Sequence, residues 1–262
     1  MKYGFIGCGN MGGAIARSLS CSTRSIMLSD RSGRAAVLAD DLGCAYSDPV
    51  TICKECDRIF LAVKPQNMAE VLQPLRGLLA ARKPLLISMA AGLTIDRIAE
   101  LAGTSLPIIR IMPNTPVAVG SGMTLYCCND LVEVSVLEDF LSDAAACGQW
   151  DALDEEQIDA AGVVSGCGPA YMYMFLDALA KGAAACGVPE EKAISYAAAT
   201  MIGAARMVQS TDLTPEALKN AVCSPGGSTH EGVRVLEDAG FAETIGNCVS
   251  AAYRRNQELG KK

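Results

Sequence analysis

The sequence predicts an α/β domain with a doubly wound parallel sheet, followed by an all-helical domain. Over the first ~150 residues, short apolar runs of strand length alternate with segments of helix length. From Ile158 to Leu259 the chain is rich in alanine and contains no convincing strand. A length of 262 residues allows one to two domains. We therefore place one domain at residues 1–153 and a second at residues 154–262.

Five runs in the first domain have the length and apolar character of strands: Tyr3–Ile6, Ser25–Ser29, Arg58–Val63, Leu85–Met89 and Ile108–Met112. Helices are expected to begin between them, near Met11, Arg31, Gln66 and Ile95. Two further runs are candidates for edge strands, Leu125–Cys128 and Trp150–Leu153. This alternation is typical of a parallel sheet covered by helices on both faces.

The second domain is predicted to consist of helices over Tyr171–Gly187, Glu190–Gln209, Thr214–Cys223 and Thr244–Leu259. Tyr171–Gly187 and Ala193–Ala205 are apolar on nearly every face, so both must be buried all round. A helical unit of ~110 residues has too little interior for this. The sequence therefore predicts a subunit interface, and with it a homo-oligomer.

A membrane is the other place where apolar surface can be buried, because the chain is 50% hydrophobic and only 19% charged. Its two long uncharged runs, Ile111–Asn129 and Ala160–Leu176, contain prolines and glycines and fall below the ~20 residues of a bilayer span. The first residues become glycine-rich too early for the apolar core of a signal peptide. We expect a soluble, cytoplasmic protein.

The cysteines and the charge exclude other classes of protein. Twelve cysteines are scattered along the chain, and the pair Cys53 and Cys56 has neither a second such pair nor a histidine partner. We expect reduced thiols and no metal site. The net charge is −7, with no block of basic residues. Neither nucleic acid nor an anionic membrane is an expected partner.

A G-x-G-x-x-G pattern follows the first predicted strand and begins a helix. In this context the glycines allow a tight turn, the close approach of a pyrophosphate, and close contact between helix and strand. The pyrophosphate then lies at the N-terminus of the helix. The sequence predicts dinucleotide binding at Gly7, Gly9, Asn10, Met11 and Gly12.

The end of the second strand selects the cofactor, and its residues point in two directions. Asp30 lies 18 residues after Gly12, near the spacing of an acid that binds the ribose of NAD. The cations and hydroxyl that follow at Arg31, Ser32 and Arg34 suit the 2′-phosphate of NADP. Asp30 is equally suited to be the N-cap of a helix beginning at Arg31. We favour NADPH, with NADH as the alternative, and include Ser29, Asp30 and Arg31 in the site.

Three further loops follow strands at the edge where such sheets bind ligands. The first carries Lys64, placed to reach a phosphate or the nicotinamide ribose unless it is only a solvated lysine. The last is a rigid polar loop around Asn114, placed to flank the nicotinamide. The candidate cofactor-binding residues of these loops are Ala62, Val63, Lys64, Pro65, Ala90, Ala91, Pro113 and Asn114.

In the helical half, the segment from Ser224 to Thr229 has the form of a helix N-terminus with small residues, hydroxyls and free N–H groups. Such an end binds anions, and a carboxylate suits it, although many helices simply begin this way. His230, the single histidine, follows Thr229. We do not assign it the acid–base role, because the neighbouring motif already explains the site.

Six motifs together resemble the Δ1-pyrroline-5-carboxylate reductase family: GFIGCGNMGGAIA, AVKPQ, SMAAG, RIMPNTP, SGCGPAYMY and AVCSPGGST. The resemblance covers Tyr3 to Leu259, and SGxGPAY followed about sixty residues later by SPGGxT is its most specific part. It implies an N-terminal Rossmann domain and a helical domain that dimerises, with dimers often assembled into rings. It also implies reduction of pyrroline-5-carboxylate to L-proline by NAD(P)H.

In that family the SPGGxT loop binds the substrate carboxylate through backbone amides, and its threonine hydrogen-bonds the ring nitrogen. By this resemblance the catalytic residue is Thr229, and the substrate-binding residues are Ser224, Gly226, Gly227, Ser228 and Thr229. The chain departs from the family at Cys167, where serine is common, and at His230, where an apolar residue is usual. The first change is expected to be tolerated, and the second leaves the local pH dependence open.

Two other functions compete with this interpretation. A β-hydroxyacid dehydrogenase also joins a Rossmann domain to helices, but it places a catalytic lysine early in the helical half. Here Gly168 to Leu179 contains no lysine, and the first is Lys181. A non-catalytic dinucleotide sensor would explain Gly7–Gly12 but gives the SPGGST segment no purpose.

Overall fold

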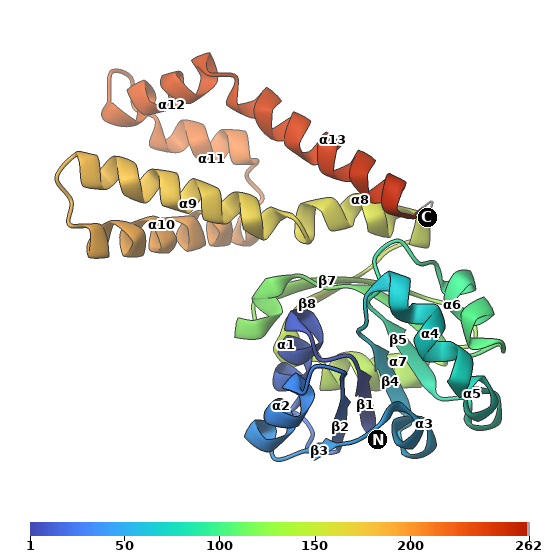
Figure 1. The fold of residues 1–262 in the computed structure, drawn as a ribbon. Helices are drawn as coiled ribbons and strands as arrows, with labels where there is room; N and C mark the ends of the chain where they lie inside the picture. The colour runs from blue at the N-terminus through green and yellow to red at the C-terminus, as the bar shows by residue number, and fades with distance from the viewer. Residues whose placement is uncertain (261–262) are drawn as a thin grey trace. The chain divides into compact units, whose positions relative to one another are not determined.

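A computed structural model describes the backbone of residues 1–260 and the side chains of residues 1–258 (Figure 1). The chain divides into two compact units. Unit 1 comprises Met1–Pro169 together with the C-terminal residues from Ala252, and unit 2 comprises Ala170–Ala251. None of the helices in the described part of the chain combines the length and hydropathy that a bilayer crossing requires.

Unit 1 is built on an eight-stranded sheet with the strand order β3-β2-β1-β4-β5-β6-β7-β8. The strands from β3 to β6 are parallel, which confirms the predicted doubly wound sheet and all five of its predicted strands. The two candidate edge strands also form, as β7 and β8. The strands are β1 (Tyr3–Ile6), β2 (Ile26–Ser29), β3 (Ala45–Tyr46), β4 (Arg58–Leu61), β5 (Leu85–Ser88), β6 (Ile108–Met112), β7 (Gly122–Cys128) and β8 (Gly148–Ala152).

The direction of the chain reverses between β6 and β7. Only a short 3₁₀ turn, η3 (Thr115–Val119), and Gly120 at φ +68° separate the polar loop after β6 from the next strand. A parallel connection needs a crossover of a dozen or more residues, so β7 returns antiparallel to β6. The longer connection through α7 then makes β8 parallel to β7.

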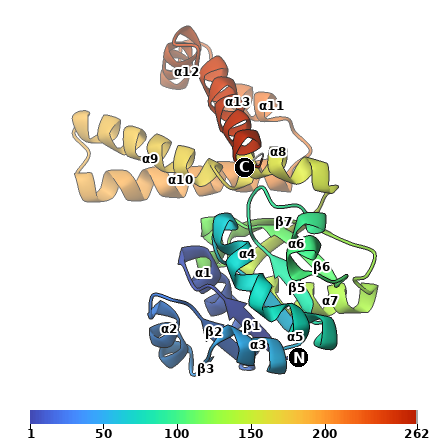
Figure 2. The same ribbon diagram turned by 45° about the vertical axis from the view of Figure 1, so that its right-hand side comes forward.

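Helices cover both faces of this sheet (Figures 1 and 2). Buried side chains of α1, α2 and α7 pack on one face, and those of α3 to α6 pack on the other. The sequence patterns missed α3, although Asp48 caps it and Pro49 begins it, and they also missed α7. The helices of unit 1 are α1 (Asn10–Leu19), α2 (Arg34–Leu42), α3 (Pro49–Glu55), α4 (Met68–Leu72), α5 (Arg76–Arg82), α6 (Ile95–Ala102), α7 (Val134–Asp143) and α8 (Glu155–Ser165).

A buried arginine lies among the aromatic residues of the core. Phe5 and Phe60 stack with their ring centroids 4.3 Å apart. Nearby, the buried guanidinium of Arg58 donates to the hydroxyl of Tyr3 and to Asp143, the latter at 3.2 Å. Burial is the main cause that raises the pKa of Tyr3, so this phenol is neutral at physiological pH. The cluster therefore joins β1, β4 and α7 as a structural contact.

Unit 2 is entirely helical in its described residues, and α9 and α10 lie side by side in both views (Figures 1 and 2). Its elements are α10 (Glu190–Ser210), α11 (Pro215–Val222), α12 (Ser228–Asp238) and most of α9 (Gly168–Ala185) and α13 (Phe241–Gly260).

Unit 2 has almost no core of its own. Ala193 and Ala197 are its only buried residues among those described. Large apolar side chains on its surface include Met172, Tyr173, Met174, Phe175, Leu179, Tyr196, Ile202, Met207, Val235 and Phe241. Many exposed apolar side chains of this kind are typical of an interaction surface.

Candidate active site

The glycine-rich turn after β1 leads into α1 and leaves the start of that helix open. Gly7 has φ +103°, and a Cβ built on it would lie 2.7 Å from the backbone of Ala62. A Cβ on Gly12 would lie 2.5 Å from the carbonyl oxygen of Gly7. Neither position accepts another residue without a backbone shift, because both hold the turn close to its neighbours.

Gly9 has the opposite surroundings. It is the N-cap of α1, its backbone is extended, and a Cβ built on it meets no atom within 4 Å. Asn10 and Met11 are the first two residues of the helix, where N–H groups have no partner within the helix. The space over Gly9 and these N–H groups fit the pyrophosphate of a dinucleotide.

The loop after β2 is held by Asp30, but not as a helix cap. Its carboxylate accepts hydrogen bonds from the Ser32 hydroxyl at 2.8 Å and from the N–H of Gly33 at 3.0 Å. Gly33 has φ +80° and is itself the N-cap of α2, which begins at Arg34. The expectation of a helix from Arg31 capped by Asp30 is therefore wrong, because the Asp30 side chain stabilises a turn before the helix.

A cavity of about 650 Å³ lies where β1, β2 and β4 end. It brings together eight of the predicted cofactor-binding residues: Gly7, Gly9, Ser29, Asp30, Arg31, Ala62, Val63 and Lys64. Residues that the sequence patterns did not indicate also line it, including Pro49, Val50, Asn67, Glu70, Val71, Pro74 and Leu75. The other eight candidates lie outside its lining, namely Asn10, Met11, Gly12, Pro65, Ala90, Ala91, Pro113 and Asn114.

Of the candidates outside the cavity lining, Asn10, Met11 and Gly12 belong to α1. The others lie in the loops that follow β4, β5 and β6. Lys64 precedes the 3₁₀ turn η1 (Pro65–Asn67), and Ala90 is buried behind the end of β5 while Ala91 is exposed. The Asn114 amide is hydrogen-bonded on both sides: it donates to the carbonyl of Ser165 at 3.0 Å and accepts from the N–H of Met123 at 2.9 Å. The side chain of Asn114 thus shapes the loop after β6 and ties it to α8.

The second predicted site lies in unit 2, between α11 and α12. Gly226 has φ +71°, a conformation that favours glycine. A Cβ on Gly227 would lie 2.4 Å from the Ser224 hydroxyl, which would have to turn away. Gly227 is the N-cap of α12 and carries no capping side chain, and Ser228 and Thr229 form the first turn. These N–H groups and hydroxyls are exposed in unit 2 and suit a carboxylate.

Charged groups near this loop have separate roles. The Lys219 ammonium lies 3.0 Å from Glu237 and so joins α11 to α12 across the base of the loop. His230 is exposed, and its Nδ1 lies 3.7 Å from Glu231. That distance is too long for a hydrogen bond, so His230 is not oriented as a general acid within this unit.

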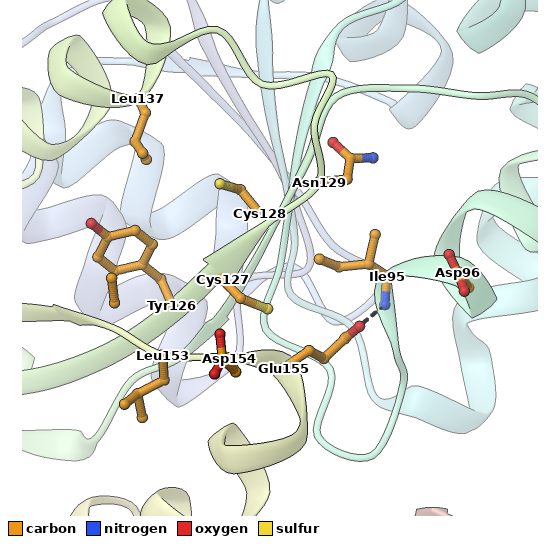
Figure 3. Close-up of a pocket in the computed structure, with 11 residues that line it drawn as sticks. Ile95, Asp96, Tyr126, Cys127, Cys128, Asn129, Leu137, Leu153, Asp154 and Glu155 are labelled. Carbon is orange, nitrogen blue, oxygen red and sulfur yellow. Dashed lines mark hydrogen bonds between the residues drawn. The ribbon is translucent and has the colours of Figure 1, made fainter.

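A different hollow, of about 450 Å³, lies beside β7 and the beginnings of α6 and α8 (Figure 3). Glu155 points into it and accepts the N–H of Ile95 at 2.8 Å. Burial raises the pKa of the Cys127 thiol to about 11, so Cys127 is a neutral thiol at physiological pH. None of the predicted site residues lines this hollow.

We expect the buried thiols of unit 1 to resist modification and to destabilise the fold in alkali. Burial raises the pKa of Cys8 to about 12, and of Cys53 and Cys56 to about 11, from 9.0. Because the unfolded thiols ionise near pH 9 and the folded ones only near pH 11–12, the folded state is fully stable with respect to these groups below about pH 9. Its free energy of unfolding then falls as the pH rises from 9 toward 11–12. A disulfide reagent at pH 8 should label exposed Cys21 and spare these three, as mass spectrometry would report. Rapid labelling of Cys53 or Cys56 in the folded protein would contradict their burial.

Both halves of the chain match known proteins. Residues 155–259 match the family model for pyrroline-5-carboxylate reductase dimerisation, and residues 2–92 match that for NADP oxidoreductase, coenzyme F420-dependent. The pyrroline-5-carboxylate reductase of Escherichia coli (strain K12) is 38% identical over 99% of this chain and 98% of its own length. That of Arabidopsis thaliana is 36% identical over 99% of this chain and 96% of its own.

Solved structures extend the similarity to the fold. The pyrroline carboxylate reductase of Plasmodium falciparum, solved with NADP bound, superimposes with a TM-score of 0.88 at 31% identity, over 99% of this chain and 98% of that one. The 1-pyrroline-5-carboxylate reductase of Streptococcus pyogenes gives a TM-score of 0.90 at 29% identity, over 98% of both chains.

Proposed function

The chain belongs to the pyrroline-5-carboxylate reductase family, and from this premise we propose which of its residues carry out the reaction. The enzyme reduces Δ1-pyrroline-5-carboxylate, a cyclic imine with a carboxylate, to L-proline. It is an NAD(P)H-dependent oxidoreductase, and NADP is the cofactor that the related Plasmodium structure holds. Neither a β-hydroxyacid dehydrogenase nor a non-catalytic sensor is favoured by these relatives.

Unit 1 is proposed to hold the dinucleotide. Backbone N–H groups at Gly9, Asn10 and Met11 bind the pyrophosphate, while Gly7 and Gly12 keep the turn close to β4. The other proposed contacts are Ser29, Asp30, Arg31, Ala62, Val63, Lys64, Pro65, Ala90, Ala91, Pro113 and Asn114, the last through the loop that its amide shapes. The bound nicotinamide supplies the hydride.

The loop before α12 is proposed to hold the substrate. The observation that carries this assignment is the open helix N-terminus at Gly227, where adjacent N–H groups and hydroxyls lie on the surface without a capping side chain. The N–H groups of Gly226 and Ser228, with the Ser224 hydroxyl, bind the carboxylate. The N–H of Gly227 donates to the Ser224 carbonyl at 3.0 Å, so Gly227 contributes by holding the turn. The Thr229 hydroxyl then hydrogen-bonds the ring nitrogen.

This arrangement suits the chemistry of an imine. The protonated iminium is the better electrophile, so the protein needs to hold the ring in place and stabilise the charge state of its nitrogen. A hydroxyl at Thr229 does this without a strong acid, and it is the proposed catalytic group. The proton on nitrogen then comes from Thr229, from bound water or from solvent.

Turnover by the purified protein tests the function as a whole. Pyrroline-5-carboxylate is mixed with the protein and NADPH, and in a second assay NADH, while the absorbance of the reduced nicotinamide is followed. We expect oxidation with NADPH and slower oxidation with NADH. No oxidation with either cofactor would refute the function.

Thr229→Ala is expected to lower kcat/KM by about 10- to 100-fold, since a hydrogen bond to a charged group contributes roughly 1.5–3 kcal/mol. Thr229→Ser keeps the hydroxyl and should retain most of the activity. The measurement is steady-state kinetics of both variants with saturating NADPH. Full kcat/KM in Thr229→Ala would remove Thr229 from the mechanism while leaving the reaction assigned.

We also propose that residues 154–262 act together in substrate binding and dimerisation. The match of residues 155–259 to a dimerisation family and the uncovered apolar side chains of α9 and α10 support this. The proposed assembly is a homodimer, with dimers joined into a ring, and light scattering in solution measures it. Twelve free cysteines support a reducing, cytoplasmic location.

A further inference from the structure

An ion pair spans the cavity at the ends of β1, β2 and β4. Arg31, in the loop after β2, donates from its two terminal nitrogens to the two carboxylate oxygens of Glu70 in α4, at 2.6 and 3.2 Å. Both residues line the cavity, and they are 39 positions apart in the chain. This two-bond geometry is the one in which a guanidinium also binds a phosphate.

The neighbouring hydroxyl is also engaged by a carboxylate. Ser32 donates to Asp30 at 2.8 Å, so the two donors of this loop that suit a 2′-phosphate both bond to acids of the protein. Arg31 lowers the pKa of the Glu70 carboxyl through these hydrogen bonds, so Glu70 is charged at neutral pH. Among the described residues that line the cavity, Lys64 is the other cation, and it forms no ion pair.

We propose that Glu70 is a specificity-determining residue. Its carboxylate occupies the part of the Arg31 guanidinium that would bind the 2′-phosphate of NADPH. NADPH must separate Arg31 from Glu70 and lie beside the released carboxylate. NADH carries only hydroxyls at this position, so it binds without separating the ion pair and without placing a phosphate beside the Glu70 carboxylate. Glu70 therefore weakens the binding of NADPH relative to that of NADH. Without Glu70, Arg31 would give the protein a stronger preference for NADPH over NADH. The proposal rests on the assignment of this cavity to the adenosine end of the cofactor.

The expected size of the effect follows from exposure. The Arg31 and Glu70 side chains are 70% and 62% exposed, and exposed ion pairs are weak. Loss of this competition, together with loss of one negative charge near the phosphate, is expected to tighten NADPH binding about three- to tenfold. The effect should shrink as salt is added, because salt screens exposed charges.

Titration calorimetry with cofactor fragments tests the proposal without turnover. We would measure Kd for 2′,5′-ADP and 5′-AMP, and for NADPH and NADH, on the wild-type protein and on Glu70→Gln. The variant should bind 2′,5′-ADP and NADPH about three- to tenfold more tightly, with 5′-AMP and NADH changed less than about twofold. Glu100→Gln is the matched control, since Glu100 pairs with Arg97 on α6, outside the cavity, and should change nothing.

Two more variants separate the effect of the Arg31–Glu70 ion pair from that of the negative charge on Glu70. Glu70→Asp keeps the charge on a shorter side chain and should show only part of the gain. In Arg31→Gln, 2′,5′-ADP should bind more weakly, and adding Glu70→Gln should then restore little of this binding.

An unchanged ratio of the Kd values for 2′,5′-ADP and 5′-AMP in Glu70→Gln would overturn the proposal. Weaker NADH binding would also overturn it, because Glu70 would then be a ligand of the ribose hydroxyls. Fragment binding without imine reduction would refute the proposed function alone, whereas absence of fragment binding would refute the cofactor site and this proposal with it.

Discussion

Replacing Gly9 by valine is expected to weaken NADPH binding by at least about 100-fold while leaving the fold intact. Two charge-assisted hydrogen bonds to the pyrophosphate contribute together roughly 3 kcal/mol or more, which corresponds to this factor. Gly9 has φ −69° and extended backbone that valine adopts readily, and its missing Cβ points into open space. The added side chain therefore begins in open space and occupies the volume that the pyrophosphate needs.

Gly77→Val is the matched control for Gly9→Val. Gly77 is an exposed position in α5 where a Cβ also meets no atom within 4 Å, but it lies outside the cavity. Both variants should unfold within a few degrees of the wild type, and only Gly9→Val should lose NADPH in a fluorescence titration. If Gly9→Val bound NADPH normally, the pyrophosphate would lie elsewhere. A variant that failed to fold would instead contradict the open surroundings of Gly9.

Sequence patterns predicted the parts of this fold that depend on local residues. Strands such as Tyr3–Ile6 are buried on both faces and therefore appear as continuous apolar runs. The two-residue β3 is exposed and too short for any pattern to mark. A local signal for α3 was present, because Asp48 is suited to cap a helix and Pro49 to begin one. The helix was still missed, because it is short and the strand before it, β3, has only two residues.

The candidate site was predictable where a motif sets the backbone and was not predictable where side chains meet across the fold. Gly7, Gly9 and Gly12 are recognisable because only glycine fits such a turn. Glu70 was missed because it reaches Arg31 only through the strand order, which places β2 and β4 on either side of β1. The hydrogen bonds of the Asn114 amide to Ser165 and Met123 were not predictable either, because no spacing encodes them.

The largest loss of stability is expected from neutralising the two acids that face Arg110. This guanidinium is 3% exposed in β6, and it bonds to Glu155 at 3.1 Å and to Asp159 at 2.6 Å. The Glu155 carboxylate also accepts the N–H of Ile95 at the start of α6. One buried cation thus fastens the first two turns of α8 to the sheet, which explains why α8 packs with unit 1 although residues 155–259 match a dimerisation family.

Glu155→Gln combined with Asp159→Asn keeps the shapes of both side chains but leaves the guanidinium buried without a counter-charge. A buried ion pair that loses one partner costs roughly 3–5 kcal/mol, and the partial exposure of the acids places the expected loss at about 3 kcal/mol. The free energy of unfolding in urea measures it. Glu100→Gln, which breaks the exposed pair with Arg97, should cost less than about 0.5 kcal/mol.

Arg110→Met should destabilise the protein less than the double acid variant does. Methionine fills much of the arginine volume without a charge, and the Glu155 and Asp159 carboxylates, at 30% and 35% exposure, can hydrate once the cation is gone. The ordering of the two losses separates an uncompensated buried charge from a simple loss of packing. If Arg110→Met were the more damaging change, the contact would depend on the bulk of the arginine side chain, and the ionic explanation for the position of α8 would be wrong.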